Sequence, residues 1–232
     1  MKFNSKGLFS KAFGLLALGN LLVYALLHIS FNISSDISVS PDFAFYFEMV
    51  RGYITDAWEL AFPIVAALLM LSELKYNGAK KAFLGGFIMS LSRLFYSLFY
   101  YYIVFITAGY DTSESIPYAL LASIGAILLC FISLTVLTGI GYVIFKRSGE
   151  EKPPLSAIPS VAVAITAVQF IIFIAVELVD TVEFFTDYGL DYTFEEIALI
   201  AFNYLYILVM TVVAYYLGRA ILTQVEKKRL GA

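Results

Sequence analysis

Long apolar runs alternate with short polar breaks along the whole chain. A helix needs roughly 20 apolar residues to cross the hydrocarbon core of a bilayer, and the runs are of that length. The pattern therefore predicts an all-α integral membrane protein with six transmembrane helices in a single polytopic domain, residues 1–232. The predicted spans are residues 12–33, 56–74, 88–108, 118–145, 157–178 and 194–222.

The polar breaks predict where helices begin and end. Asp56 followed by Glu59, and Thr193 followed by a glutamate at the same spacing, are patterns that cap helix N-termini. We therefore expect the second and sixth spans to begin there. Residues 34–55 combine acidic and aromatic side chains and predict an outer loop at the level of the lipid headgroups. The residues after Leu222 are expected to form a polar tail.

A basic break with three lysines, at residues 75–81, separates the second and third apolar runs. Two interpretations fit the residues from 76 to 108. In the first, residues 82–108 form one tilted helix with Arg93 well inside the membrane. In the second, residues 76–87 form a separate helix on the cytoplasmic surface, and the third span begins near Arg93. We favour the second, because a lone arginine at the centre of a bilayer costs at least about 2.5 kcal/mol and usually needs a partner.

Acidic and aromatic residues follow the fifth apolar run. Their mixture predicts a short amphipathic or re-entrant element on the outer surface, between the fifth and sixth spans. Solvated charge is the ordinary interpretation of such carboxylates, and binding of a cation or a basic peptide is the alternative. The candidate residues of this outer acidic surface are Glu183, Asp187, Asp191 and Glu195.

Basic residues predict the orientation in the membrane. With six crossings and the amino terminus inside, thirteen of the fifteen Lys and Arg residues fall on the cytoplasmic side, which leaves Arg51 outside and Arg93 in or near the membrane. We therefore expect a multi-pass protein of the cell membrane, in contact with the lipid bilayer and with both termini in the cytoplasm. Composition agrees, since 61% of the residues are apolar and 14% are charged, against about 45–50% and about 25% in soluble proteins.

The sequence lacks the motifs of several enzyme classes. It has one His and one Cys, and it contains no His-Glu-x-x-His, Gly-x-Ser-x-Gly or Gly-x-x-x-x-Gly-Lys-Ser/Thr pattern. Zinc-dependent hydrolysis, serine catalysis at a nucleophile elbow and ATP hydrolysis on this chain therefore all lack parts. We expect no enzyme activity, metal site or cofactor in this chain, and no nucleic-acid partner.

Polar residues inside the predicted spans are few. Such groups face other helices or a water-filled path, because they are costly in contact with lipid. Asn20, His28 and Gln169 are therefore candidate residues of a translocation path. Hydrogen bonds between helices, without a role in transport, are the alternative.

Seven residues stand in a recognisable order after a second span that contains Trp58. They are Glu73, Asn77, Gly78, Lys80, Lys81, Ser92 and Arg93. This order resembles the break after the second span of bacterial ABC-2-type permeases, which are the membrane subunits of a class of ABC exporters. The resemblance implies a homo- or heterodimer of permease subunits, and two separate ATPase chains that hold the ATP and act through residues 76–87. The candidate coupling residues are Glu73, Lys75, Asn77, Gly78, Lys80, Lys81 and Arg93.

The sequence leaves three functions open. The first is the permease subunit of an ATP-driven exporter, which provides the translocation path. The second is a membrane scaffold or accessory subunit that binds a protein or a cationic peptide at the outer acidic surface. The third is a stand-alone channel or secondary carrier that uses His28, Gln169 and Arg93 along its path.

Overall fold

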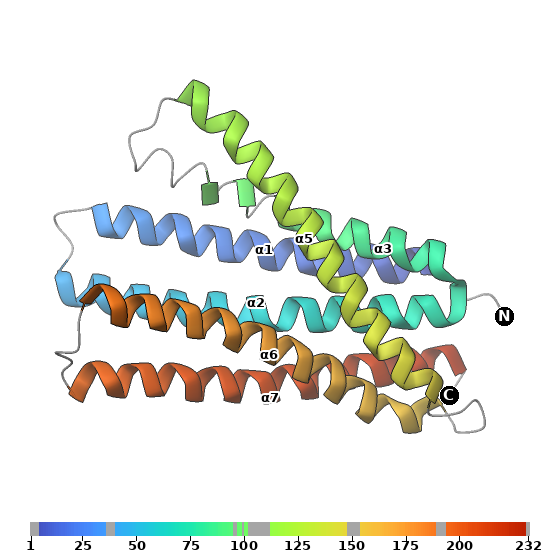
Figure 1. The fold of residues 1–232 in the computed structure, drawn as a ribbon. Helices are drawn as coiled ribbons and strands as arrows, with labels where there is room; N and C mark the ends of the chain where they lie inside the picture. Colours follow the sequence, from blue (N-terminus) through green and yellow to red (C-terminus); the bar gives the residue numbers. More distant parts are fainter. Residues whose placement is uncertain are drawn as a thin grey trace.

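The computed structural model describes residues 5–35, 40–94, 97–98, 100–101, 112–147, 154–188 and 194–230, and in these ranges the chain is a bundle of helices without a strand (Figure 1). The labelled helices are α1 (Ser5–Ser35), α2 (Pro41–Asn77), α3 (Ala79–Leu91), α5 (Thr112–Arg147), α6 (Pro154–Tyr188) and α7 (Phe194–Leu230). Consecutive helices run in opposite directions along the bundle (Figure 1). The beginning of α1 and the end of α7 therefore lie at the same end.

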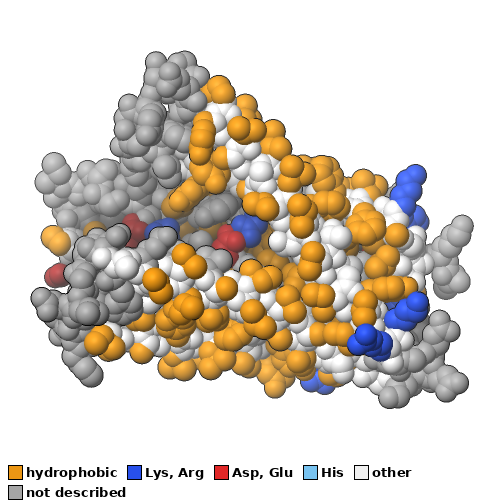
Figure 2. All heavy atoms as spheres, viewed as in Figure 1, with side chains coloured by type: hydrophobic (Ala, Val, Ile, Leu, Met, Phe, Trp, Pro, Cys, Tyr) orange, Lys and Arg blue, Asp and Glu red, His pale blue; other side chains and the backbone are white. Residues whose placement is uncertain are grey.

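One end of the bundle is basic. The joint between α2 and α3 and the last turns of α5 and α7 lie there (Figure 1), and Figure 2 shows Lys and Arg side chains gathered at that end, with apolar side chains over the sides. We call it the basic end. Its exposed basic residues include Lys80, Lys81, Lys146, Arg147, Lys227 and Lys228.

Four helical stretches in the described residues are long and apolar enough to cross a membrane. They are Pro41–Asn77, Ile116–Arg147, Ser156–Ala175 and Ile197–Lys228, and α1 contributes a shorter apolar stretch, Gly14–Ser30. Many of their large apolar side chains are exposed on the outside of the bundle, as expected for side chains that face lipid. Residues 102–108 of the predicted third span lie outside the described residues.

The central helix is α2, since it contacts every other labelled helix. Residues 60–71 of α2 are apolar on all sides of the helix, and a helix with that pattern is stable only when it is surrounded. Ile64, Ala66 and Leu68 have no exposed surface. The core of the protein is therefore built around one helix rather than between two layers.

The structure corrects the predicted start of this helix. α2 begins at Pro41, and the Ser40 side chain caps it by accepting a hydrogen bond from the Phe43 backbone N–H at 3.3 Å. Proline suits the first turn, where its missing N–H is not needed. The predicted outer loop, residues 34–55, is thus helical from residue 41 onward. Asp56 and Glu59 lie inside the helix and do not cap it.

The predicted break at residues 76–93 is corrected as well. α2 ends at Asn77, and Gly78, with φ of 87°, allows the chain to reverse. α3 then returns alongside α2 and also packs on α1 and α5. The helix is separate, as the second interpretation has it, but it covers Ala79–Leu91 instead of residues 76–87 and lies along α2 instead of on the surface at the end of the bundle. One continuous helix is wrong, because a turn at Ser92 interrupts it, where the Ser92 hydroxyl donates to the Met89 carbonyl at 2.6 Å.

The ends of the last two helices differ from the prediction. α6 continues through the acidic stretch to Tyr188, so the described residues contain no separate short outer element between the predicted fifth and sixth spans. The first helix-breaking residue in that stretch is Gly189, which explains the extension. α7 continues to Leu230, so most of the predicted tail is helical.

Gly19 permits the closest approach of α1 to α2. A Cβ atom there would overlap the ring of Trp58, whereas a Cβ at Gly14, on the same helix, would meet nothing within 4 Å. We expect Gly19→Ala to lower the free energy of unfolding by about 1–3 kcal/mol, the usual cost of overpacking. Because Trp58 is the only tryptophan, its fluorescence in detergent reports the change directly.

Gly14→Ala is the matched control for this prediction, and it should leave both the emission spectrum and the stability within about 0.5 kcal/mol of the wild type. Equal effects of the two substitutions would contradict the contact between α1 and α2.

Candidate functional site

A charged pair crosses the interior of the bundle. The two terminal guanidinium nitrogens of Arg93, Nη1 and Nη2, donate to the carboxylate of Glu59, each at 2.5 Å. Glu59 is the middle residue of the 37-residue α2, so it lies roughly 27 Å from either end of that helix. The face of the Phe62 ring supports the guanidinium, at 4.7 Å from its centroid. Arg93 therefore has the partner that an arginine at this depth requires.

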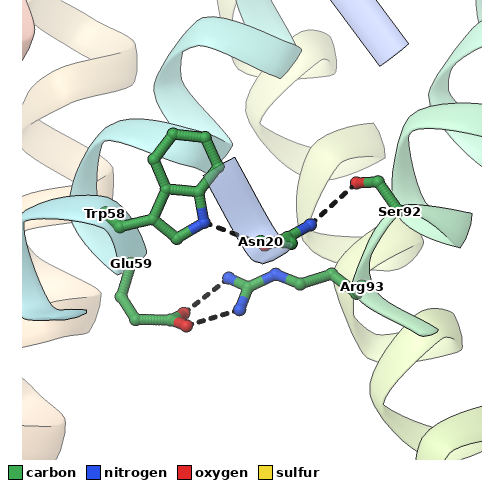
Figure 3. Close-up of polar contacts among 5 residues, drawn as sticks. All are labelled: Asn20, Trp58, Glu59, Ser92 and Arg93. Carbon is green, nitrogen blue, oxygen red and sulfur yellow. Dashed lines mark hydrogen bonds and ion pairs between the residues drawn. The ribbon is translucent and has the colours of Figure 1, made fainter. Parts of the chain in front are cut away.

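A chain of hydrogen bonds from α1 holds the turn that carries Arg93. The Trp58 indole N–H donates to the Asn20 side-chain oxygen at 2.8 Å, and the Asn20 amide donates to the Ser92 hydroxyl at 3.0 Å. Figure 3 shows Asn20 between Trp58 and Ser92, directly beside the Glu59–Arg93 pair. Asn20 and Ser92 are buried. The network therefore fixes Ser92, which precedes Arg93, and Trp58, which precedes Glu59.

A cavity of about 350 Å³ lies beside the charged pair. Its walls come from α2, α5, α6 and the residues that follow Ser92. Cys130 of the lining is near the middle of the apolar stretch of α5, so the cavity is far from both ends of the bundle. Figure 2 shows a hollow in the side of the bundle where acidic and basic side chains meet.

The lining of the cavity is unusually polar for the interior of apolar helices. Besides the two charges it contains Gln169 and Ser133 from opposite walls, and the aromatic side chains of Tyr100 and Tyr101. Pockets that bind small molecules combine apolar walls with a few convergent polar groups. In the described ranges, no three His, Cys, Asp or Glu side chains gather as a metal site would require.

The three predicted path residues lie in different places. Gln169 lines the cavity. Asn20 is next to it but is occupied by its bonds to Trp58 and Ser92. His28 is on an exposed face of α1, where its ring meets that of Tyr24 edge-on at 6.2 Å.

The predicted coupling residues also separate. Glu73 is fully buried and accepts a hydrogen bond from the Asn77 amide at 2.7 Å. Lys75 lies against the end of α7. Gly78, Lys80 and Lys81 form an exposed tip at the basic end, residues 78–81. Arg93 lines the cavity, seven residues after Gly86. Gly86 itself packs on Met70 of α2.

A second buried charge joins the end of α7 to α2. The Glu226 carboxylate accepts hydrogen bonds from Ser72, at 3.2 Å, and from Tyr76, and it pairs with Lys75 at 3.5 Å. The Lys75 ammonium also lies 4.1 Å from the centre of the Phe145 ring of α5. Since Glu226 needs these partners to stay buried, the contacts explain why the predicted tail is helical.

The structure does not describe the side chains of the outer acidic surface. Asp191 is not among the described residues, and of Glu183, Asp187 and Glu195 only the helical backbone is described. A second cavity, of about 530 Å³, lies between α2, α6 and α7, farther from the basic end than the first. One of its two carboxylates, Glu48, is held by Arg51 at 2.8 Å and by Ser30.

The sequence analysis missed the ion pair of Glu59 with Arg93, because Glu59 also fits a helix-capping pattern with Asp56. The sequence nevertheless contains a signal for this pair. Glu59 and Arg93 are charged residues at the edges of two apolar runs, and the glycine between these runs reverses the chain. Two antiparallel helices can bring such residues together, so a search for the partner of Arg93 on the preceding helix would have found Glu59.

The helices and their exposed apolar faces define the class: this is a multi-pass, all-α membrane protein. No family model, curated protein or solved structure matches the chain.

Proposed function

We propose that the protein is a permease whose translocation path includes the cavity beside Glu59 and Arg93, and that it serves as the membrane subunit of an ATP-driven exporter. The observation that carries the proposal is the cavity itself. Charged and polar side chains are costly among membrane helices, and those that occur there mark the routes of solutes and ions. Here Glu59, Arg93 and Gln169 meet around one space of about 350 Å³.

The exposed tip, residues 78–81, supports the coupling to a separate ATPase. It stands at the basic end, which we assign to the cytoplasm on the positive-inside rule. α3, with 13 helical residues, joins it to the turn at Ser92, directly before Arg93, so a force on the tip would be transmitted along this helix to that turn. As the resemblance to ABC-2-type permeases implies, two such subunits then pair and bind two ATPase chains.

Reversing the charge of the tip tests the coupling. In protein purified from native membranes, we expect Lys80→Glu with Lys81→Glu to reduce the co-purifying ATPase activity at least about tenfold, because charge complementarity governs such docking. Lys227→Glu with Lys228→Glu is the matched control. These lysines are exposed at the same end of the bundle but belong to α7, and the control should retain the activity. ATPase activity that survives reversal at the tip would place the partner elsewhere.

A stand-alone carrier is the second candidate, and one observation favours it: a single chain supplies both charges and the walls of the cavity. Purified protein in liposomes without any ATPase distinguishes the two. Solute flux under these conditions supports the carrier, and flux that requires an added ATPase fraction and ATP supports the exporter.

A further inference from the structure

We infer that the cavity beside Glu59 and Arg93 binds a small zwitterion, a molecule with one anionic and one cationic group. The inference rests on the function proposed above and specifies its substrate class. It follows from the charges of the lining, from their geometry and from the size of the space.

The two charges face the cavity as a neutral pair. The Glu59 side chain is 30% exposed and that of Arg93 is 13% exposed, and both line the cavity. A ligand with a single charge would compensate one of them and leave the other without its opposite charge, which is strongly unfavourable among apolar helices. A zwitterion compensates both, with its anion on Arg93 and its cation on Glu59.

The geometry favours this arrangement. The guanidinium presents two parallel N–H donors, the pattern that binds a carboxylate through two hydrogen bonds. Phe62 lies against a face of the guanidinium and Glu59 is bound at its edge, so a ligand carboxylate would take the place of the Glu59 carboxylate at that edge. The rings of Tyr100 and Tyr101 line the same space, and aromatic faces attract ammonium groups.

The volume limits the size of the ligand. About 350 Å³ is at the lower end of the roughly 300–1,000 Å³ typical of ligand pockets. The space suits a compact molecule of the amino-acid or betaine type and is too small for a lipid or a folded peptide.

The test measures binding of three probes to the purified full-length protein in lipid nanodiscs. The probes are glycine betaine, which is zwitterionic, tetramethylammonium, which is a cation, and propionate, which is an anion. We expect the wild type to bind glycine betaine at least about tenfold more tightly than either of the others, since each lost charge-assisted contact is worth that much or more.

Two single variants should change the class of ligand. Glu59→Gln removes the carboxylate that neutralises Arg93 and should make propionate the preferred probe. Arg93→Gln leaves Glu59 unpaired and should make tetramethylammonium preferred. The exchange variant, Glu59→Arg with Arg93→Glu, keeps a neutral pair, so it should retain the preference for glycine betaine even if the single variants do not fold.

Stronger binding of a singly charged probe by the wild type, or loss of the preference for glycine betaine in a folded exchange variant, would overturn the inference. A parallel measurement separates this outcome from failure of the proposed function. If water-soluble thiol reagents reach Cys130 but glycine betaine does not bind, the path stands and the substrate class is wrong. If neither reaches the cavity, both proposals fail.

Discussion

Replacing Glu59 with glutamine is expected to lower the free energy of unfolding by at least about 2.5 kcal/mol, because Arg93 then remains among apolar helices without its carboxylate. Removing one partner of a fully buried pair costs about 3–5 kcal/mol. The pair is not fully buried, since the Arg93 side chain is 13% and that of Glu59 30% exposed, so we expect a value near the lower limit. Chemical unfolding in detergent, followed by the fluorescence of Trp58, measures the change next to the substituted residue.

Two controls separate the loss of the pair from the loss of a carboxylate. The double variant, Glu59→Gln with Arg93→Gln, should recover at least half of the lost stability, because no unpaired charge remains. Glu48→Gln makes the same chemical change on the same helix, where the partner Arg51 is three residues away and more exposed than Arg93, 27% against 13%, and it should cost less than about 1 kcal/mol. A double variant less stable than Glu59→Gln would show that Arg93 has no need of Glu59.

The sequence predicted the class of the fold because hydrophobicity in a membrane is a strong and local signal. Runs of about 20 apolar residues predicted helices, and the structure confirms an all-helical protein with several stretches able to cross a membrane. Six crossings and the orientation stay predictions, as does the cytoplasmic location of the termini.

Helix boundaries were harder to predict, since more than one cap fits the same sequence. Asp56 with Glu59 and Ser40 with Pro41 are both plausible helix starts, and the choice depends on contacts with other helices. Glu59 lies inside the bundle because it pairs with Arg93, 34 residues later in the chain. This is a tertiary contact, and a local sequence pattern does not predict it.

The break after the second span shows the same limit. The basic break at residues 75–81 predicted an interruption, and the structure has one at Gly78, with a positive φ. The predicted location of α3, on the cytoplasmic surface, was wrong. The prediction assumed that Arg93 would have no partner inside the membrane. Once Glu59 is present, a helix that returns along α2 is allowed, and Gly86 lets it approach Met70 closely.

In the proposed account, one rigid element joins the two parts of the site. The exposed tip, residues 78–81, begins α3, and the turn held by Asn20 at Ser92 ends it. We propose that a partner at the tip acts on Arg93 through this short helix, and that substrate binds when Arg93 and Glu59 exchange each other for a ligand.

Labelling of Cys130 reads out whether the cavity contains water. The only cysteine of the chain is part of the lining. A thiolate in contact with water attacks methanethiosulfonate reagents, forming a mixed disulfide and releasing methanesulfinate. Charged reagents of this type do not enter lipid, so their rate of reaction measures access by water. Ile132, two residues along α5, is 56% exposed on the outer surface of the helix and does not line the cavity. Ile132→Cys in a Cys130→Ala background therefore offers a matched thiol at almost the same depth.

This comparison tests the central claim, that a water-filled polar path lies inside the bundle, most directly. In membrane vesicles, we expect a charged reagent to label Cys130 at least about tenfold faster than the cysteine of the Ile132→Cys control, and an excess of glycine betaine to slow only the first reaction. Equal, slow labelling of both thiols would mean that the cavity is closed to water, and would contradict the account of this protein as a permease.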